Sequence, residues 1–405
     1  MNIKDKLKSI NQEQLLKFED ELTKEEKEAL YSQIESIDFS VVNLVGKDKK
    51  EAKRGVISPL EALDLSRISE KEDIYRAEGI KAIKAGKVGA VLLAGGMGTR
   101  LGSNDPKGMY NVGLTRELFI FECLINNLMD VVKECDAYIH LFVMTSDLNH
   151  ESTMNFFEEK NYFGYPKEYI TFFKQEMAPC CSYEGKVFLE SKGKVAVSPN
   201  GNGGWFVSMM RTGVLDIAKK AGIEWFNIFA VDNVLQRICD PVFVGATILE
   251  KKNVGAKVVR KASPDEKVGV LCLEDGKPSI VEYYELTEQM ANETDSRGER
   301  VYNFGVILNY LFNLSNLEEI VKHTLDYHIV EKKIPYIDEN GMEVKPEAPN
   351  GCKFEQLVLD MIYLAGSCLP FEVVREKEFA PIKNKTGVDS VDSARELLKK
   401  NGVVL

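Results

Sequence analysis

An apolar run that breaks into a glycine-rich segment constrains this chain more than any other feature. Residues 88–94 carry no charged side chain, which predicts a strand buried within a parallel sheet. The segment that follows contains Gly95, Gly96, Gly98, Arg100, Gly102 and Lys107. Glycine permits positive φ and lets a ligand approach the backbone, and successive N–H groups beside cations bind anions. We predict that residues 95–108, the glycine loop, bind phosphate.

Two familiar phosphate-binding loops fit this sequence poorly. A P-loop ends in Gly-Lys-Ser/Thr, whereas Gly102 is followed by Ser103 and Asn104. The dinucleotide fingerprint requires a small third residue where Leu101 stands, which argues against a nicotinamide site. An ordinary turn between a strand and a helix is the remaining alternative, because glycine clusters also serve tight turns.

The middle of the chain alternates between strand and helix patterns. Apolar runs predict strands over 138–144, 169–173 and 225–231, and residues 151–157 form a helical pattern. Such alternation favours an α/β fold, whose ligands lie at the carboxyl ends of the strands. Gly95, Gln175 and Asp232 each come just after a predicted strand.

Three regions are predicted along the 405 residues, since a chain of this length exceeds what one core usually fills. Residues 1–85 form a helical N-terminal region, and the spacing at 58–61 (Ser-Pro-Leu-Glu) predicts a helix start there. Residues 86–335 form the catalytic domain, which includes a hairpin around Asp275-Gly276. Residues 336–405 form a small C-terminal α/β region.

Composition narrows the partners and the compartment. A net charge of −11 argues against nucleic acid or an anionic membrane as a partner. The eight cysteines form no Cys-x-x-Cys pair and are expected to be buried thiols, and the four histidines form no zinc pattern. No apolar run is long enough to cross a membrane and residues 1–5 lack the apolar stretch of a signal peptide, so we expect a cytoplasmic protein.

The glycine loop also carries a resemblance to a known family. Residues 93–108 resemble the Leu-x-Gly-Gly-x-Gly-Thr-Arg-Leu-Gly…Pro-Lys-Gly motif of nucleotidyltransferases that make nucleotide sugars. Further strings narrow the resemblance to the eukaryotic-type UDP-N-acetylglucosamine pyrophosphorylases; they lie at 107–114, 144–146, 151–153, 199–204, 231–233, 332–336, 349–351 and 378–381. This resemblance implies a Rossmann-like, GT-A-like nucleotidyltransferase fold, with a mixed sheet flanked by helices.

The same resemblance assigns roles to individual residues. It implies nucleotide contacts from Leu93, Ala94, Gly95, Gly96, Lys107, Gln175, Gly201, Asp232 and Lys353. It implies sugar contacts from Asn202, Glu282, Tyr283 and Lys383. Arg100, Lys107 and Lys383 would be catalytic, because they neutralise the reacting phosphates. Asp232 would bind Mg²⁺, which typically takes one or two carboxylates and completes its shell with phosphate oxygens and water.

The implied substrates are UTP and a sugar 1-phosphate, with N-acetylglucosamine 1-phosphate leading. Three residues depart from the family pattern: Val306 replaces an asparagine that contacts the sugar, Met97 replaces glutamine, and Asn200 replaces aspartate. Val306 therefore keeps glucose 1-phosphate, or several hexose phosphates, open as the substrate. A nucleotide-sugar sensor without turnover is the alternative from another class. The sequence leaves the oligomeric state open.

Overall fold

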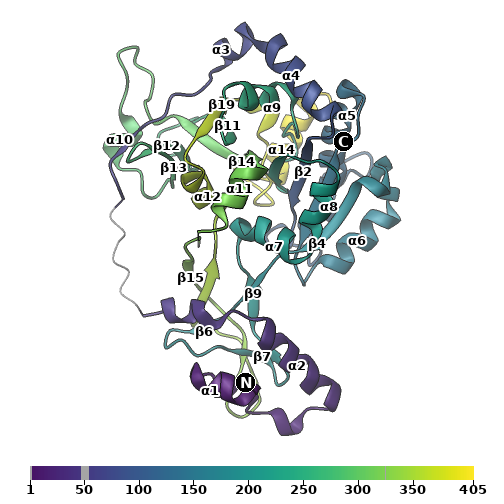
Figure 1. Ribbon diagram of the computed structural model, residues 1–405, viewed down its shortest axis with the longest axis vertical. Coiled ribbons are helices and arrows are strands. Elements are labelled where there is room, and N and C mark those ends of the chain that lie inside the picture. Colours follow the sequence, from purple (N-terminus) through teal and green to yellow (C-terminus); the bar gives the residue numbers. More distant parts are fainter. Residues whose placement is uncertain (1, 47–53, 324) are drawn as a thin grey trace. The chain divides into compact units, whose positions relative to one another are not determined.

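The computed structural model describes residues 2–46, 54–323 and 325–405. These residues form two compact units built from interleaved segments (Figure 1). The first unit takes its described residues from 1–53, 176–204 and 325–358, and the second from 54–175, 205–324 and 359–405. The predicted regions 1–85, 86–335 and 336–405 cut across both units, so the boundaries of the functional domains stay a prediction.

The second unit is built on a ten-stranded mixed sheet. Its strands are β1 (Ile57–Pro59), β2 (Val88–Leu93), β3 (His140–Thr145), β4 (Ile170–Lys174), β10 (Trp225–Ala230), β11 (Val254–Arg260), β12 (Val270–Glu274), β13 (Lys277–Val281), β14 (Phe304–Asn313) and β19 (Cys368–Glu372). The main path runs β1-β12-β14-β10-β2-β3-β4. Strands β10, β2, β3 and β4 are parallel neighbours, while β14 is antiparallel to β10. The predicted mixed α/β fold is confirmed.

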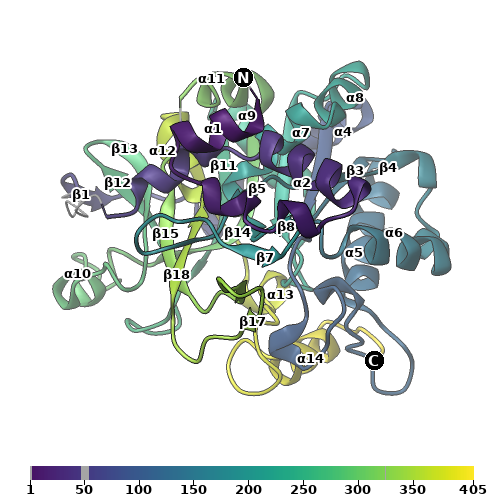
Figure 2. The same cartoon turned by 90° about the horizontal axis from the view of Figure 1, so that it is seen from below.

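Helices flank this sheet on both faces (Figure 2). The α-helices of this unit are α3 (Leu65–Glu70), α4 (Glu72–Lys84), α5 (Ile120–Cys135), α6 (His150–Glu159), α7 (Trp205–Arg211), α8 (Val214–Lys220), α9 (Pro241–Leu249), α10 (Glu288–Asn292), α11 (Leu314–Ile320), α12 (Val358–Ala365), α13 (Arg375–Glu378) and α14 (Val391–Lys400). Ala90 and Leu92 of β2 lie in one core cluster with α4, α5 and α9. Trp205 of α7 packs on Phe226 of β10 instead. Successive side chains of a strand point to opposite faces of the sheet. Because helices cover both faces here, every residue of β2 is buried.

Two glycines allow α4 and α9 to pack at very close range. A Cβ on Gly79 would lie 1.8 Å from the carbonyl oxygen of Pro241, and one on Gly245 would lie 1.8 Å from that of Tyr75. Such distances are impossible for a real side chain, so glycine is required at both positions. This contact fixes α9, which begins just after the loop that follows β10.

The predicted strands over 88–94, 138–144, 169–173 and 225–231 and the helix over 151–157 are confirmed as β2, β3, β4, β10 and α6, but one predicted element is wrong. Residues 58–61 do not begin a helix, because Ser58 and Pro59 lie in β1, where Ser58 pairs with Leu273. Proline is tolerated there because β1 is at the end of the strand order, an edge position. The hairpin is confirmed: β12 and β13 pair antiparallel around Asp275 and Gly276, both at positive φ.

The first unit combines two helices with short strands. The helices are α1 (Ile3–Ser9) and α2 (Lys24–Ser36). The strands are β5 (Met177–Pro179), β6 (Cys181–Ser182), β7 (Leu189–Ser191), β8 (Lys194–Val195), β9 (Val197–Pro199), β15 (His328–Lys332), β16 (Tyr336–Ile337), β17 (Glu343–Val344) and β18 (Gly351–Glu355). A separate core, which includes Leu30, Ile34 and Phe354, packs the helices against these strands.

Candidate functional site

The glycine loop folds back on itself after β2. The N–H of Gly98 donates to the carbonyl oxygen of Asp105 at 2.8 Å, and the N–H of Lys107 donates to that of Gly96 at 3.1 Å. These bonds place Lys107 beside Gly96, which is three residues beyond the end of β2 at Leu93. A Cβ at Gly96 would meet no atom of the described chain within 4 Å, so the space beside this backbone is open to a ligand.

Polar residues that follow β3 and β4 contact the start of the glycine loop. The side chain of Asn149 donates to the carbonyl oxygen of Ala94 at 2.9 Å, and Ser146 donates to that of Gly95 at 3.0 Å. The N–H of Gln175 continues the β3–β4 pairing by donating to Thr145 at 2.8 Å. A Cβ on Gly95 would lie 2.3 Å from Gln175 Nε2, so the buried amide of Gln175 lies directly against the loop.

Ser146 and Asn149 support the glycine loop, although the sequence analysis gave neither of them a role. Both are fully buried polar side chains just after β3, and they hold the carbonyl oxygens of Gly95 and Ala94 at the start of the loop. Their signal was weak, because Ser and Asn after a strand are also typical of ordinary turns. Only the parallel pairing of β2 with β3 places them under the loop.

Lys107 faces the carboxylate of Asp232, which follows β10. Lys107 Nζ lies 3.9 Å from Asp232 Oδ2, and both side chains are mostly buried. Burial lowers the pKa of Lys107; the charge of Asp232 opposes this shift, and the charges of Arg100 and Lys383 add to it. The Lys107 ammonium therefore lies within electrostatic range of the Asp232 carboxylate and of two further cations, Arg100 and Lys383. A local gathering of cations is the environment that a polyphosphate requires.

Lys383 reaches this group through pairing between segments that are far apart in sequence. Asn233 forms a bridge with Pro381, and the N–H of Ile382 donates to the carbonyl oxygen of Asp232 at 2.9 Å. The Lys383 ammonium donates to Asp389 at 2.9 Å. The second unit thus brings Lys107 and Lys383 to the loop of Asp232, with Arg100 within electrostatic range of Lys107, and the roles of these residues toward a ligand stay predictions.

Glu282 and Tyr283, the predicted sugar contacts, follow β13 in the same unit. Tyr283 is exposed and its ring contacts that of Tyr284. A Cβ on Gly269 would lie 3.5 Å from Glu282 Oε1, and the carbonyl oxygen of Gly269 accepts from the N–H of Val306 at 2.9 Å. Glu282 and Val306 therefore flank the same residue.

Gly201, Asn202 and Lys353 belong to the first unit. Gly201 has φ of +90°, and a Cβ there would lie 2.3 Å from the carbonyl oxygen of Gln356, so only glycine fits. The side chain of Asn202 accepts from the N–H of Val358 at 2.9 Å. Lys353 lies on β18 opposite Val330 of β15. Their roles toward a ligand stay predictions.

The residues present fit a metal ion that takes some of its ligands from the protein and the others from a bound substrate. Asp232 offers a partly exposed carboxylate at the end of β10. Within residues 2–46, 54–323 and 325–405, no group of three or more His, Cys, Asp or Glu side chains could hold an ion alone. Pyrophosphorylases of this type use a divalent metal, and one carboxylate suffices where phosphate oxygens complete the shell.

The fold and the site together define a nucleotide-binding α/β protein of the nucleotidyltransferase type: a glycine loop, several cations and one carboxylate meet at the carboxyl ends of parallel strands. The chain belongs to the UTP–glucose-1-phosphate uridylyltransferase family, whose model matches residues 39–403. The predicted family, fold class and enzyme class are confirmed.

Individual relatives agree with this assignment. The chain is 35% identical over 413 residues to UDP-N-acetylhexosamine pyrophosphorylase-like protein 1 of Mus musculus, covering 96% of this chain and 81% of the relative. It is 35% identical over 420 residues to UDP-N-acetylglucosamine diphosphorylase 2 of Arabidopsis thaliana, covering 97% and 82%. Among solved structures, the uridine diphosphate N-acetylglucosamine pyrophosphorylase of Trypanosoma brucei superposes with a TM-score of 0.84 at 29% identity, covering 97% and 83%.

In the part of the chain that the structure describes, no helix has both the length and the apolarity needed to cross a bilayer.

Proposed function

We propose that this protein is a Mg²⁺-dependent uridylyltransferase that joins UTP and N-acetylglucosamine 1-phosphate into UDP-N-acetylglucosamine and pyrophosphate. The observation that carries the proposal is the group formed by Arg100, Lys107, Asp232 and Lys383 beside the glycine loop. The sugar is inferred from the relatives, which are named as UDP-N-acetylglucosamine pyrophosphorylases or diphosphorylases. The cytoplasmic location stays a prediction.

The reaction requires alignment and charge neutralisation and needs no protein nucleophile. A phosphate oxygen of the sugar 1-phosphate attacks the α-phosphorus of UTP, and the bond to the β-phosphate oxygen breaks as pyrophosphate leaves with its electron pair. Both reactants are anions that repel one another. Holding them in line supplies about 7–11 kcal/mol of the barrier, and each preorganised charged donor adds about 3 kcal/mol.

The chain's own residues divide this work. Gln175 faces the loop with a buried amide, whose donor and acceptor match the edge of a pyrimidine base. The open backbone at Gly96 receives the nucleotide, and Arg100 and Lys107 bind its phosphates. Lys383 binds the phosphate of the incoming sugar. Mg²⁺ held by Asp232 supplies further positive charge to the phosphates when bound.

Glucose 1-phosphate is the second candidate substrate, and Val306 is the observation that favours it. Val306 and Glu282 flank Gly269, so the position at which the family pattern has an asparagine lies beside a predicted sugar contact. Valine offers no hydrogen bond to an N-acetyl group. Its presence is consistent with a looser preference among hexose phosphates.

Pyrophosphate release from UTP and Mg²⁺ with a panel of sugar 1-phosphates tests the proposal. We expect release with N-acetylglucosamine 1-phosphate to exceed that with glucose 1-phosphate. A clear preference for glucose would keep the reaction and replace the sugar. Calorimetric binding of UTP or a UDP-sugar without any release would favour the sensor instead.

A further inference from the structure

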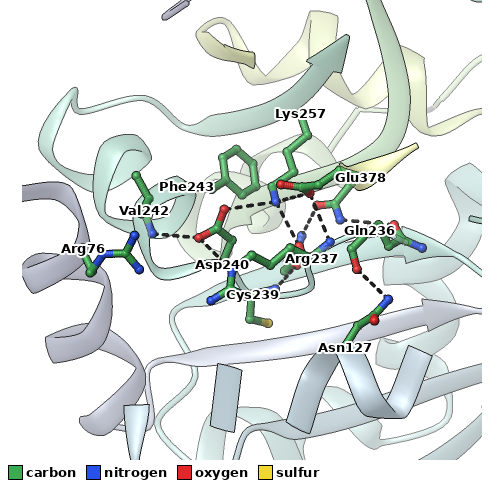
Figure 3. Close-up of polar contacts among 12 residues, drawn as sticks. Arg76, Asn127, Gln236, Arg237, Cys239, Asp240, Val242, Phe243, Lys257 and Glu378 are labelled. Carbon is green, nitrogen blue, oxygen red and sulfur yellow. Dashed lines mark hydrogen bonds and ion pairs between the residues drawn. The ribbon is translucent and has the colours of Figure 1, made fainter. Parts of the chain in front are cut away.

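A buried ion cluster lies beside the proposed site and has no part in the chemistry above. The side chain of Lys257, on β11, is fully buried. Its ammonium lies 2.6 Å from Glu378 Oε2 and 3.3 Å from Asp240 Oδ2 (Figure 3). It also donates to the carbonyl oxygen of Arg237 at 3.0 Å. Buried ion pairs are weak contributors to net stability and are best attested as devices that fix geometry.

Glu378 connects this cluster to the loop that carries Asp232. Its carboxylate accepts from Lys257 and from the N–H of Arg237 at 3.1 Å. Its carbonyl oxygen accepts from the side chain of Asn233 at 2.7 Å, and Asn233 Oδ1 in turn accepts from the N–H of Ala380 at 2.9 Å. Glu378 is thus held at both its side chain and its backbone.

The segment that begins at Glu378 leads directly to Lys383. Beyond Ala380, the N–H of Ile382 donates to the carbonyl oxygen of Asp232. Residues 378–383, which we call the lysine segment, therefore run alongside Asp232 and Asn233 from the ion cluster to the proposed site. A change in the position of Glu378 would be transmitted to Lys383 over a short, fully hydrogen-bonded path.

The loop that follows Asp232, which pairs with the lysine segment, is also held by the ion cluster. Arg237 and Asp240 lie in the loop after Asp232, where Gln236 donates to the carbonyl oxygens of Ala230 at 2.7 Å and Asn233 at 2.9 Å. Asp240 accepts from Lys257, as Glu378 does (Figure 3). One ammonium thereby joins the loop that carries the carboxylate and the segment that carries the cation.

We propose that Lys257 and Glu378 are positioning residues that set the distance between Lys383 and Asp232. Neither touches the phosphates; both act through the lysine segment. This inference rests on the role given to Lys383 in the proposed function, and it predicts that charge removal in the cluster impairs turnover through Lys383 alone.

The test combines Glu378→Gln with Lys383→Ala in the full chain. Glu378→Gln should lower kcat by about 100-fold, the cost of displacing a catalytic group by about 1 Å. The KM for UTP should stay within about threefold, because the glycine loop and Gln175 are untouched. In the Lys383→Ala background, Glu378→Gln should change kcat by less than about threefold, because the residue it acts through is already gone. If the double variant lost kcat by the product of the two single-variant factors, the proposal would be overturned.

Glu372→Gln is the matched control. Glu372 is also a buried carboxylate with one ion pair, to Arg260 Nε at 2.7 Å, and it lies on β19 outside the lysine segment. We expect its kcat to stay within about threefold of wild type. If Glu378→Gln folds poorly, the pair Lys257→Met with Glu378→Gln removes the two opposite charges of the 2.6 Å pair together, while Asp240 keeps Arg237 Nε at 3.5 Å, so this variant should fold and keep the loss in kcat. A folded pair with wild-type kcat would overturn the proposal.

Hydrogen exchange separates this inference from the proposed function. Exchange at the amides of Ala380 and Ile382 should be at least about tenfold faster in Glu378→Gln and unchanged in Glu372→Gln. Unchanged exchange in both variants would overturn the positioning role. If wild type released no pyrophosphate, the proposed function would fail while the exchange result would still report on the lysine segment.

Discussion

Replacing Lys107 with methionine removes one positive charge and keeps an unbranched apolar stem. The ammonium lies 3.9 Å from Asp232 Oδ2, at the outer limit of an ion pair, and only 18% of the side chain is exposed. Burial lowers the pKa of Lys107, and the charges of Arg100 and Lys383 lower it further. The protonated ammonium of Lys107 is therefore less stable in this site than in water, and a bound anion would stabilise it.

The stability of the fold should not suffer from this change. The pKa of Lys107 in the folded protein is below its usual value of 10.5, so at pH 7 the charged group opposes folding. Between the two pKa values the unfolded chain binds more protons, so stability rises with pH toward 10.5. Lys107→Met should be stable to within about 1 kcal/mol of wild type at pH 7, and it should lack that rise.

Activity should fall steeply in the same variant. Loss of one preorganised charged donor costs about 2.7–4 kcal/mol, or about 100- to 1000-fold in kcat. Pyrophosphate release gives kcat, and urea unfolding gives the free energy. Lys133→Met, at an exposed lysine of α5 that lies 3.5 Å from Asp130, is the control and should change neither. A kcat within about threefold of wild type, or a loss above about 2 kcal/mol in unfolding free energy, would refute the reasoning for Lys107.

Three further predictions follow from the structure. Asp232→Asn should lower kcat by at least about 100-fold and raise the Mg²⁺ concentration for half-maximal rate; an unchanged Mg²⁺ titration would remove Asp232 from the metal site. Val306→Asn should raise the ratio of kcat/KM for N-acetylglucosamine 1-phosphate over glucose 1-phosphate by about tenfold, and an unchanged ratio would exclude Val306 from sugar selection. Gly79→Ala should lower the free energy of unfolding by about 1–3 kcal/mol in a urea titration, since its Cβ would meet Pro241; wild-type stability would contradict the close packing of α4 on α9.

The parts of the site that lie at strand ends could be predicted from the sequence. The apolar run of β2 and the glycines after it are local signals, and they locate the loop to within a few residues. Gly95, Gln175 and Asp232 each follow a strand of the parallel part of the sheet. Since parallel strands end at the same edge, the meeting of these residues follows from chain order and topology alone.

Lys383 and its supporting cluster could not be predicted in this way. The bond between Ala380 and Asn233 joins residues 147 positions apart, and that between Lys257 and Glu378 joins residues 121 apart. No local pattern encodes such pairs, and only the family resemblance pointed to Lys383. A lysine in an otherwise apolar strand gives no sign that it is fully buried until its partners are known.

Tertiary pairing also overrode one local signal. Ser58 and Pro59 have the composition of a helix start, yet they add an edge strand to the sheet through pairing with residues of β12 more than two hundred positions away. A local helix-start pattern predicts the structure poorly where a sheet edge offers hydrogen bonds to the same backbone.

The most direct test of the central claim is to follow the phosphorus atoms during turnover by ³¹P NMR, with UTP, Mg²⁺ and N-acetylglucosamine 1-phosphate as the only additions. The cations and the Asp232 carboxylate at the glycine loop predict that UDP-N-acetylglucosamine and pyrophosphate appear in equal amounts as both reactants disappear. Persistence of both reactants, or conversion of UTP to UMP or UDP without a sugar product, would contradict the account.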